Sequence, residues 1–183
     1  GTISNPMIKA SSPYKDEDLL PVALIALAPS MVVVPHHAKY QNLKDFVEAS
    51  KASQGFNFAT AGSGSTPHFV AEILNVKYGA KLQPVPYKSG SESTTAVMGG
   101  QVEGTSEASI IALPHILHDG KFKALATTWT QRLSAYPQLA TATEQGFPEL
   151  KIAHWAGVHA PKGTPTEIMD KVAAAVDQAM KDP

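Results

Sequence analysis

The chain has 183 residues, 43% of them hydrophobic, which is enough to bury one sizeable core or two small lobes. Lys and Arg number 15 against 16 Asp and Glu, so the chain has no basic surplus to attract nucleic acid or an acidic membrane surface. It has no cysteine, which excludes disulfides, thiolate metal sites and cysteine nucleophiles. No apolar run reaches the roughly 18 residues of a membrane span.

The start of the chain has neither an initiator Met nor a signal peptide. Its opening residues, Gly1 to Pro6, resemble the interior of a protein rather than an end. We therefore expect the sequence to be a processed or truncated part of a longer protein.

The first predicted elements are two short strands and a helix. Apolar residues at 20–27 and 31–34 flank Ala28-Pro29-Ser30 and predict two strands with a break between them. An amphipathic helix is predicted over 42–52, with Asn42 as its N-cap.

From residue 56 onward, strands alternate with helices. The predicted order is strand 56–60, helix 67–78, strand 82–87, helix 92–98, strand 101–105, helix 110–118 and strand 122–128. This alternation is typical of an α/β fold with a parallel sheet built from βαβ units. In such sheets ligands bind beyond the carboxyl ends of the strands, where the loops of these units lie.

The pattern changes after residue 128. Residues 131–148 are predicted to be helical or loop-like, and 152–159 to form an alternating strand. Thr164 is predicted to cap a final helix, with Pro165 in its first position and Glu167 completing a capping box. We expect 35–125 to be one complete α/β lobe. Residues 1–34 and 126–183 are then a hinge and parts of a second lobe.

The loop Gly62-Ser63-Gly64-Ser65-Thr66 is the best candidate for a binding site. It lies between a predicted strand and a predicted helix, where backbone N–H groups, hydroxyls and the helix dipole favour an anion. His68 follows two residues later and offers a further donor, or only packs. The loop matches neither a phosphate P-loop nor Gly-x-Gly-x-x-Gly, and a plain tight turn that needs glycine is the alternative.

A second strand-to-helix loop, Tyr87-Lys88-Ser89-Gly90, has similar chemistry. Tyr87 and Lys88 could lean over a bound anion, or they could be a half-exposed tyrosine and a solvated lysine. Glu107 lies near the end of a predicted strand, where its carboxylate could pair with a ligand amine or be exposed. Two loops on one rim are a stronger signal than either alone.

Metal binding, cofactors and catalysis have little support. His115 and His118 are three residues apart on a predicted helix, but only Asp119 is available as a third ligand, so we expect no metal site. No Gly-x-Ser-x-Gly elbow is present, and we expect no catalytic residues and no cofactor.

Many sequence blocks, in one order, are similar to those of a known family. They are Asn5-Pro6, Leu20-Pro21-Val22, Ala61-Gly62-Ser63-Gly64-Ser65-Thr66-Pro67-His68, Val85-Pro86-Tyr87-Lys88, Gly99-Gly100-Gln101-Val102, Ala112-Leu113-Pro114-His115-Ile116, Gly120-Lys121, Ala124-Leu125-Ala126 and Ala160-Pro161-Lys162-Gly163-Thr164-Pro165. With these blocks the chain resembles the periplasmic solute-binding proteins of tripartite tricarboxylate transporters, the Bug family.

The resemblance implies a two-lobed, type II Venus-flytrap binder in the periplasm of a Gram-negative bacterium. Such a receptor captures a small carboxylate (a di- or tricarboxylate, an amino acid or an aromatic acid) and delivers it to a membrane permease. The resemblance places Ser63, Gly64, Ser65 and Thr66 on one wall of the cleft, with help from the region of Tyr87 and Lys88. Nucleic acid is not an expected partner.

The chain departs from the family at 105–111, where the run is Thr-Ser-Glu-Ala-Ser-Ile-Ile. Glu107 falls where the family often has Asp, so a role in recognising an amine is expected there. Two other readings stay open: an α/β enzyme using His68 or His115, and a fragment that binds no ligand. Truncation would also expose the apolar face of the last helix, so we predict homo-oligomers.

Overall fold

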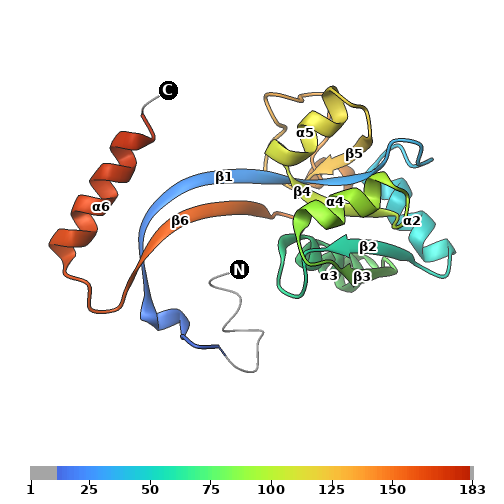
Figure 1. Ribbon diagram of the computed structural model, residues 1–183. Coiled ribbons are helices and arrows are strands. Elements are labelled where there is room, and N and C mark those ends of the chain that lie inside the picture. The colour runs from blue at the N-terminus through green and yellow to red at the C-terminus, as the bar shows by residue number, and fades with distance from the viewer. Residues whose placement is uncertain (1–11, 182–183) are drawn as a thin grey trace. The chain divides into compact units, whose positions relative to one another are not determined.

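The computed structural model describes residues 12–181 of the chain (Figure 1). Contacts divide the described residues into two units, one formed by Ala28–His154 and the other by segments 12–27 and 155–181. Within the described residues, none of the helices has the length and hydropathy needed to cross a membrane.

The helices and strands occupy much of the chain, and most lie close to their predicted positions. They are η1 (Asp16–Asp18), β1 (Leu19–Pro35), α2 (Leu43–Ala52), β2 (Phe56–Thr60), α3 (Thr66–Tyr78), β3 (Leu82–Pro86), α4 (Gly90–Met98), β4 (Gly104–Ala108), α5 (Ser109–Leu117), β5 (Phe122–Thr127), η2 (Thr143–Gln145), β6 (Ala153–Pro161) and α6 (Thr166–Ala179). The Asn42 side chain accepts a hydrogen bond from the Asp45 N–H, which confirms Asn42 as the N-cap of α2.

The strands form a mixed sheet in the order β3-β2-β4-β1-β5, with β6 also paired to β1. β2 is parallel to both β3 and β4, whereas β1 is antiparallel to β4 and β5. The predicted α/β class and its parallel strands are confirmed. The reversed direction of β1 was not predicted, since strand and helix patterns carry no information on direction.

β1 is a single strand, so the predicted break at Ala28-Pro29-Ser30 is wrong. Ser30 is fully buried and paired with Ala108 of β4. Its carbonyl accepts the Thr128 N–H at 2.8 Å, and its hydroxyl bonds to Ser106. Because these partners satisfy the polar groups of Ser30, the strand continues past a proline that itself has no N–H to donate.

The core of residues 28–154 has two parts. One contains Phe46 of α2, Phe58 of β2 and Leu74 of α3, all fully buried. The other joins Met31 of β1 to residues of α4 and α5 such as Val97 and Ala112. The sheet thus carries helices on both faces, which is the usual arrangement for βαβ units.

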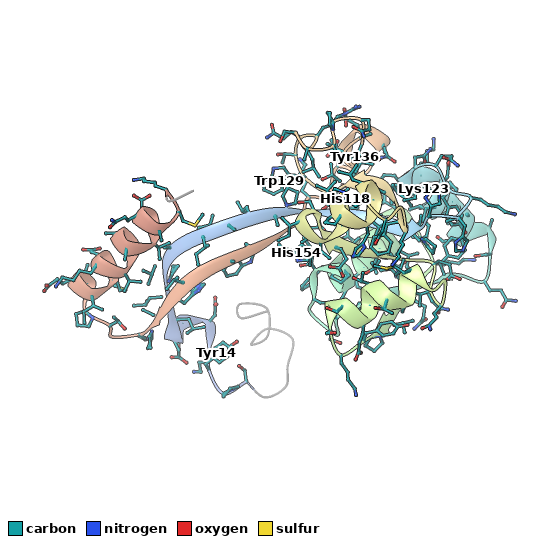
Figure 2. All side chains as sticks on the ribbon, turned by 45° about the horizontal axis from the view of Figure 1, so that its top comes forward. Tyr14, His118, Lys123, Trp129, Tyr136 and His154 are labelled. Atoms are coloured by element: carbon teal, nitrogen blue, oxygen red, sulfur yellow. The ribbon has the colours of Figure 1, made fainter. Side chains whose placement is uncertain are left out.

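A side-chain contact ties β5 to the segment that precedes α2. Lys123 Nζ donates to the Ala38 carbonyl at 2.6 Å, and Figure 2 labels this lysine. Lys123 is the one charged residue of β5 (Phe122–Thr127). Its ammonium group is engaged by this hydrogen bond and is therefore not available to bind a ligand.

In the other unit, the final helix starts later than predicted. α6 begins at Thr166, and the Thr164 hydroxyl donates to the Pro161 carbonyl at 2.7 Å instead of capping the helix. Thr164 is therefore part of the preceding turn, and the predicted capping box is wrong. None of the residues of α6 is buried, and Ile168 is 51% exposed.

Candidate functional site

The predicted site residues meet at one rim of the sheet because β2, β3 and β4 are parallel and end together. Thr60 of β2 pairs with Pro86 of β3, and Ala59 pairs with Thr105 of β4. The loops that follow these strands therefore begin side by side. We call this edge, with loop 61–65, loop 87–89 and the end of β4 at Glu107 and Ala108, the β2–β4 rim.

Loop 61–65 is a tight turn held by its own donors. The Ser65 N–H and the Ser65 hydroxyl both donate to the Gly62 carbonyl, at 3.2 and 2.7 Å. Gly62 and Gly64 have positive φ of 92° and 76°, a conformation that favours glycine. Ser63 is exposed, and Thr66 is the first residue of α3. The turn that glycine makes possible thus places Ser63 and the start of α3 at the rim.

His68, in the first turn of α3, is bound back to the same loop. Its Nδ1 lies 3.3 Å from the Gly64 nitrogen and accepts that N–H. A histidine that accepts at Nδ1 carries its proton on Nε2 when neutral, so Nε2 is a donor. The Ser65 hydroxyl is committed to Gly62, so Ser65 and His68 do not form a nucleophile–base pair.

Loop 87–89 leads into α4 through a cap. Ser89 Oγ accepts the Glu92 N–H at 3.2 Å, and Glu92 Oε2 accepts the Lys88 N–H at 3.1 Å. The spacing Ser-x-x-Glu is the capping box signal, so this cap could have been predicted from the sequence. Tyr87 is half-buried against the core, whereas the Lys88 side chain is exposed. Lys88 is therefore the solvent-exposed cation of this loop.

A shallow hollow of about 390 Å³ runs beside this loop. It is lined by Tyr87, Ser91, Glu92, Thr95, Ala96 and Gln101. Its walls are mostly the outer face of α4, which lies next to the β2–β4 rim.

Glu107, the penultimate residue of β4, is buried, with only 5% of its surface exposed. The alternative that it is exposed is wrong, because β4 spans Gly104–Ala108 rather than the predicted 101–105 and carries Glu107 into the sheet. Burial raises the pKa of Glu107 to about 7, and the Ala108 N–H and Thr94 hydroxyl oppose this shift.

Further polar side chains lie between β4 and α4. Thr105 Oγ1 donates to the Ala59 carbonyl at 2.8 Å, and the Ser93 hydroxyl lies 3.3 Å from Thr105 Oγ1. Thr94 is 6% exposed, and its Oγ1 makes no hydrogen bond of regular geometry within the described part of the chain. Ser93 and Thr94 were not among the predicted site residues. The sequence feature that could have identified them is a pair of polar residues on the face of the predicted helix that packs on the sheet.

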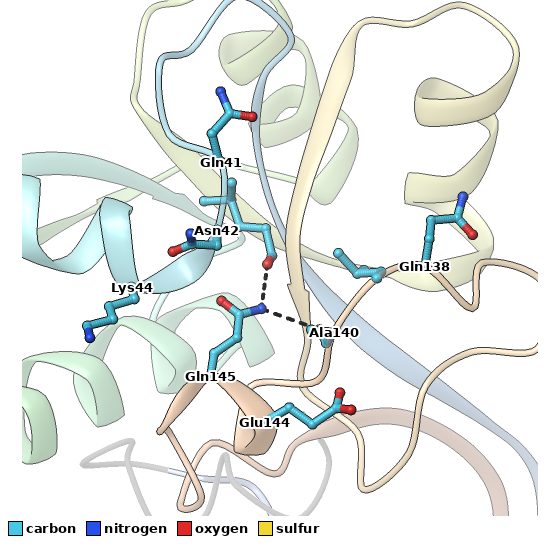
Figure 3. A pocket seen from close by; sticks show the side chains of 9 residues that line it. Gln41, Asn42, Lys44, Gln138, Ala140, Glu144 and Gln145 are labelled. Carbon is cyan, nitrogen blue, oxygen red and sulfur yellow. Dashed lines mark hydrogen bonds between the residues drawn. The ribbon is translucent and has the colours of Figure 1, made fainter.

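A larger hollow, of about 470 Å³, contains none of the predicted site residues (Figure 3). Gln145 crosses it: its Oε1 accepts the Leu43 N–H at 2.7 Å, and its Nε2 donates to the carbonyls of Leu125 and Ala140. The Gln145 amide is hydrogen-bonded to three backbone groups. We therefore interpret this hollow as part of the packing between α2 and the 138–145 segment, and not as a ligand site.

The two histidines considered for a metal lie apart from the rim. His115 Nδ1 is 2.7 Å from Asp119 Oδ2, and this contact lowers the pKa of Asp119. Among residues 12–181, no group of three His, Asp or Glu side chains is placed to hold a metal ion.

The chain matches a family model over residues 2–183, that of the tripartite tricarboxylate transporter family receptors. A curated relative is Protein BugT of Bordetella pertussis, 31% identical over 173 residues, which are 93% of this chain and 53% of BugT. The chain thus spans about half the length of the curated relatives it matches.

Two solved structures have the same fold over nearly the whole of this chain. MatC from Rhodopseudomonas palustris with bound malate matches with a TM-score of 0.86 and 27% identity, over 98% of this chain and 61% of MatC. The periplasmic binding protein BugD matches with a TM-score of 0.88 and 26% identity, over 99% of this chain and 61% of BugD. The α/β fold is that of periplasmic binding proteins, and the chain belongs to the tripartite tricarboxylate transporter receptor family.

Proposed function

We propose that the chain captures a small carboxylate at the β2–β4 rim and passes it to a membrane permease. The main observation in its support is that two strand–loop–helix junctions, at Ser63–Thr66 and at Tyr87–Lys88, lie side by side, because the strands that precede them are parallel neighbours. The N-termini of α3 and α4 bring partial positive charge to this rim, and Lys88 adds a full charge. MatC, a related protein, holds malate.

The ligand-binding lobe is proposed to be 35–125, with the hinge and second lobe in 1–34 and 126–183. The ligand class is proposed as small acids, including di- and tricarboxylates, amino acids and aromatic acids. We place the protein in the periplasm, as the description of BugD as a periplasmic binding protein supports.

A receptor is favoured over an enzyme by the contacts at the rim. Ser65 could serve as a nucleophile and His68 as a base. Each of them is hydrogen-bonded to a glycine of loop 61–65, and they are not bonded to each other. Binding to preorganised donors needs no such pair. Incubation with malate is expected to leave malate unchanged, and its conversion would favour the enzyme.

Replacing Lys88 with Ala is expected to weaken malate binding about two- to fivefold, because an exposed charge contributes up to about 1 kcal/mol to an ion pair. Isothermal titration calorimetry of the chain measures this change. Lys81→Ala is the matched control. Lys81 is also exposed and lies just before β3, at the end of the strands opposite to the β2–β4 rim. Equal losses in both variants would contradict a role for the rim.

We also propose that the chain self-associates through apolar side chains of the unit that contains α6. Leu24, Leu27, Ile168 and Met180 are each at least half exposed. Exposed apolar residues in such numbers mark interaction surfaces. Sedimentation velocity is expected to show dimers or larger species at about 100 µM, and a pure monomer at that concentration would contradict the proposal.

A further inference from the structure

Glu107 lies in a polar seam between β4 and the start of α4. We define this seam, the β4–α4 seam, by Glu107, Thr105, Ser93, Thr94 and Gly90. The two carboxylate oxygens lie 3.6 and 3.9 Å from the position that a Cβ on Gly90 would occupy, so α4 begins directly over the carboxylate. Glu107 is thus enclosed by a helix N-terminus on one side and by its own strand on the other.

No cation pairs with this carboxylate among the described residues. The titratable groups on the elements packed against β4, or on the segments next to them, are Glu72, His68, Lys77 and Tyr78 on α3, Tyr87, Lys88 and Glu92 around the start of α4, Glu103 before β4, Lys123 on β5 and His115 on α5. Several already have other partners: Glu103 accepts the Asn57 N–H, Lys123 donates to Ala38, and His115 pairs with Asp119. Burial without a cation favours the neutral form of the side chain, and this effect outweighs the partial positive charge at the start of α4, since the pKa of Glu107 is raised.

Thr94 gives the neutral form a partner. Its buried Oγ1 has no hydrogen bond of regular geometry in the described residues, although it lies close enough to Glu107 to influence the carboxylate. A protonated Glu107 has an O–H to donate, and the Thr94 oxygen can accept it. The seam therefore offers hydrogen bonds to either form of the side chain.

The β4–α4 seam lies next to the rim proposed to hold the ligand. The Glu107 oxygens are 3.6 and 3.9 Å from the Cβ position on Gly90, and Gly90 directly follows loop 87–89 of that rim. A second negative charge near a carboxylate disfavours its ionised form. An anion bound at this rim would therefore act directly on Glu107.

We propose that Glu107 takes up a proton when a carboxylate ligand binds at the β2–β4 rim, so that anion and proton enter the site together. This inference rests on the proposed function. Glu107 is then the residue that sets the dependence of ligand affinity on pH. The proton comes from solvent, goes to a Glu107 oxygen, and returns to solvent when the ligand leaves.

The sign of the pH dependence follows from the pKa of Glu107, about 7 in the free protein and higher in the complex. Below pH 7 the residue is already protonated, and affinity changes little with pH. Above pH 7 a proton must be taken up with the ligand, and Kd is expected to rise up to about tenfold per pH unit until the pKa of the complex is reached. Affinity is therefore highest on the acidic side.

The test titrates malate, whose carboxyl groups are both ionised at neutral pH, into the chain by calorimetry at pH 6.5 and pH 8. Two buffers of different ionisation enthalpy at each pH give the number of protons taken up. We expect a fraction of a proton at pH 8, together with weaker binding. Glu107→Gln is expected to show no uptake and the same Kd at both pH values. Glu103→Gln, at the other end of β4, is expected to keep the wild-type pH dependence.

A second arm follows the Glu107 carboxyl group itself, first without malate and then with it. The chain is labelled with carbon-13 at the glutamate side chains, and the titration of Glu107 is followed by NMR, with Glu107→Gln assigning the signal. A midpoint near pH 7 that rises with malate supports the proposal, and a midpoint below pH 5 overturns it. Malate binding without proton uptake also overturns it. No malate binding at all would contradict the proposed function. In that case the titration midpoint of Glu107 in the free protein would still show whether the β4–α4 seam raises the pKa of its carboxyl group.

Discussion

Replacing Glu107 with Gln is expected to raise the free energy of unfolding at pH 8 by about 3 kcal/mol. The pKa of Glu107 rises from 4.5 to about 7 on folding, because the side chain is buried without a cation. A carboxyl group with a raised pKa does not destabilise the fold below pH 4.5, where both states are protonated. It destabilises the fold progressively as pH increases to 7, and fully above that pH.

Gln removes this dependence because it has nearly the same shape and no charge. Urea unfolding of wild type and Glu107→Gln at pH 8 and pH 4 measures the difference, which is expected at pH 8 and absent at pH 4. Glu103→Gln is the control, since Glu103 is only partly buried and is bonded to the Asn57 N–H. A Glu107→Gln variant less stable than wild type at pH 8 would mean that the charge is compensated.

Replacing Phe46 with Ala is expected to cost about 3–5 kcal/mol of unfolding free energy. Phe46 is fully buried, and its ring centroid lies 5.3 Å from that of Tyr40 and 5.2 Å from that of Phe56. Removing it loses buried apolar surface, leaves a cavity and breaks an edge-to-face contact with Tyr40.

Urea unfolding at pH 7 checks this loss, with Phe69→Ala as the matched control. Phe69 is 37% exposed, so its removal is expected to cost about 1 kcal/mol or less. Similar losses for both variants would contradict the assignment of Phe46 to the centre of the core.

The pattern of strands and helices was largely accessible from the sequence, because local signals define it. Strand Phe56–Thr60 was predicted with its exact bounds, and Asn42 was identified as the cap of α2. Gly79, after α3, has a φ of 68°, the left-handed C-terminal cap that glycine provides.

What could not be predicted depends on contacts between distant segments. The direction of β1 is set by pairing with β4 and β5, more than 70 residues away in sequence. The shift of β4 depends on Gly104, where a Cβ would lie 2.9 Å from the Val33 carbonyl, so only glycine allows the strands this close. The predicted strand 101–105 included Gly104 but ended three residues too early, because the pairing of 106–108 with β1 is a contact between distant segments.

The candidate site was predicted by position rather than by chemistry. The rim and its two loops followed from the βαβ pattern, but the Ser65 hydroxyl donates to the Gly62 carbonyl and the Gly64 N–H donates to His68 of α3. These bonds depend on the conformation of the turn, which the sequence alone does not give. The burial of Glu107 and its proximity to α4 depend on the observed bounds of β4, and the sequence had left open whether this carboxylate pairs with a ligand amine or is exposed.

Backbone amide shifts during a malate titration test the central claim most directly. NMR on the nitrogen-15-labelled chain is expected to show saturable shifts concentrated at 62–66, 87–90 and 107–109, with residues of the Gln145 hollow and of α6 unaffected. Shifts confined to other segments, or none at malate concentrations that saturate MatC, would contradict the assignment of the β2–β4 rim as the carboxylate site.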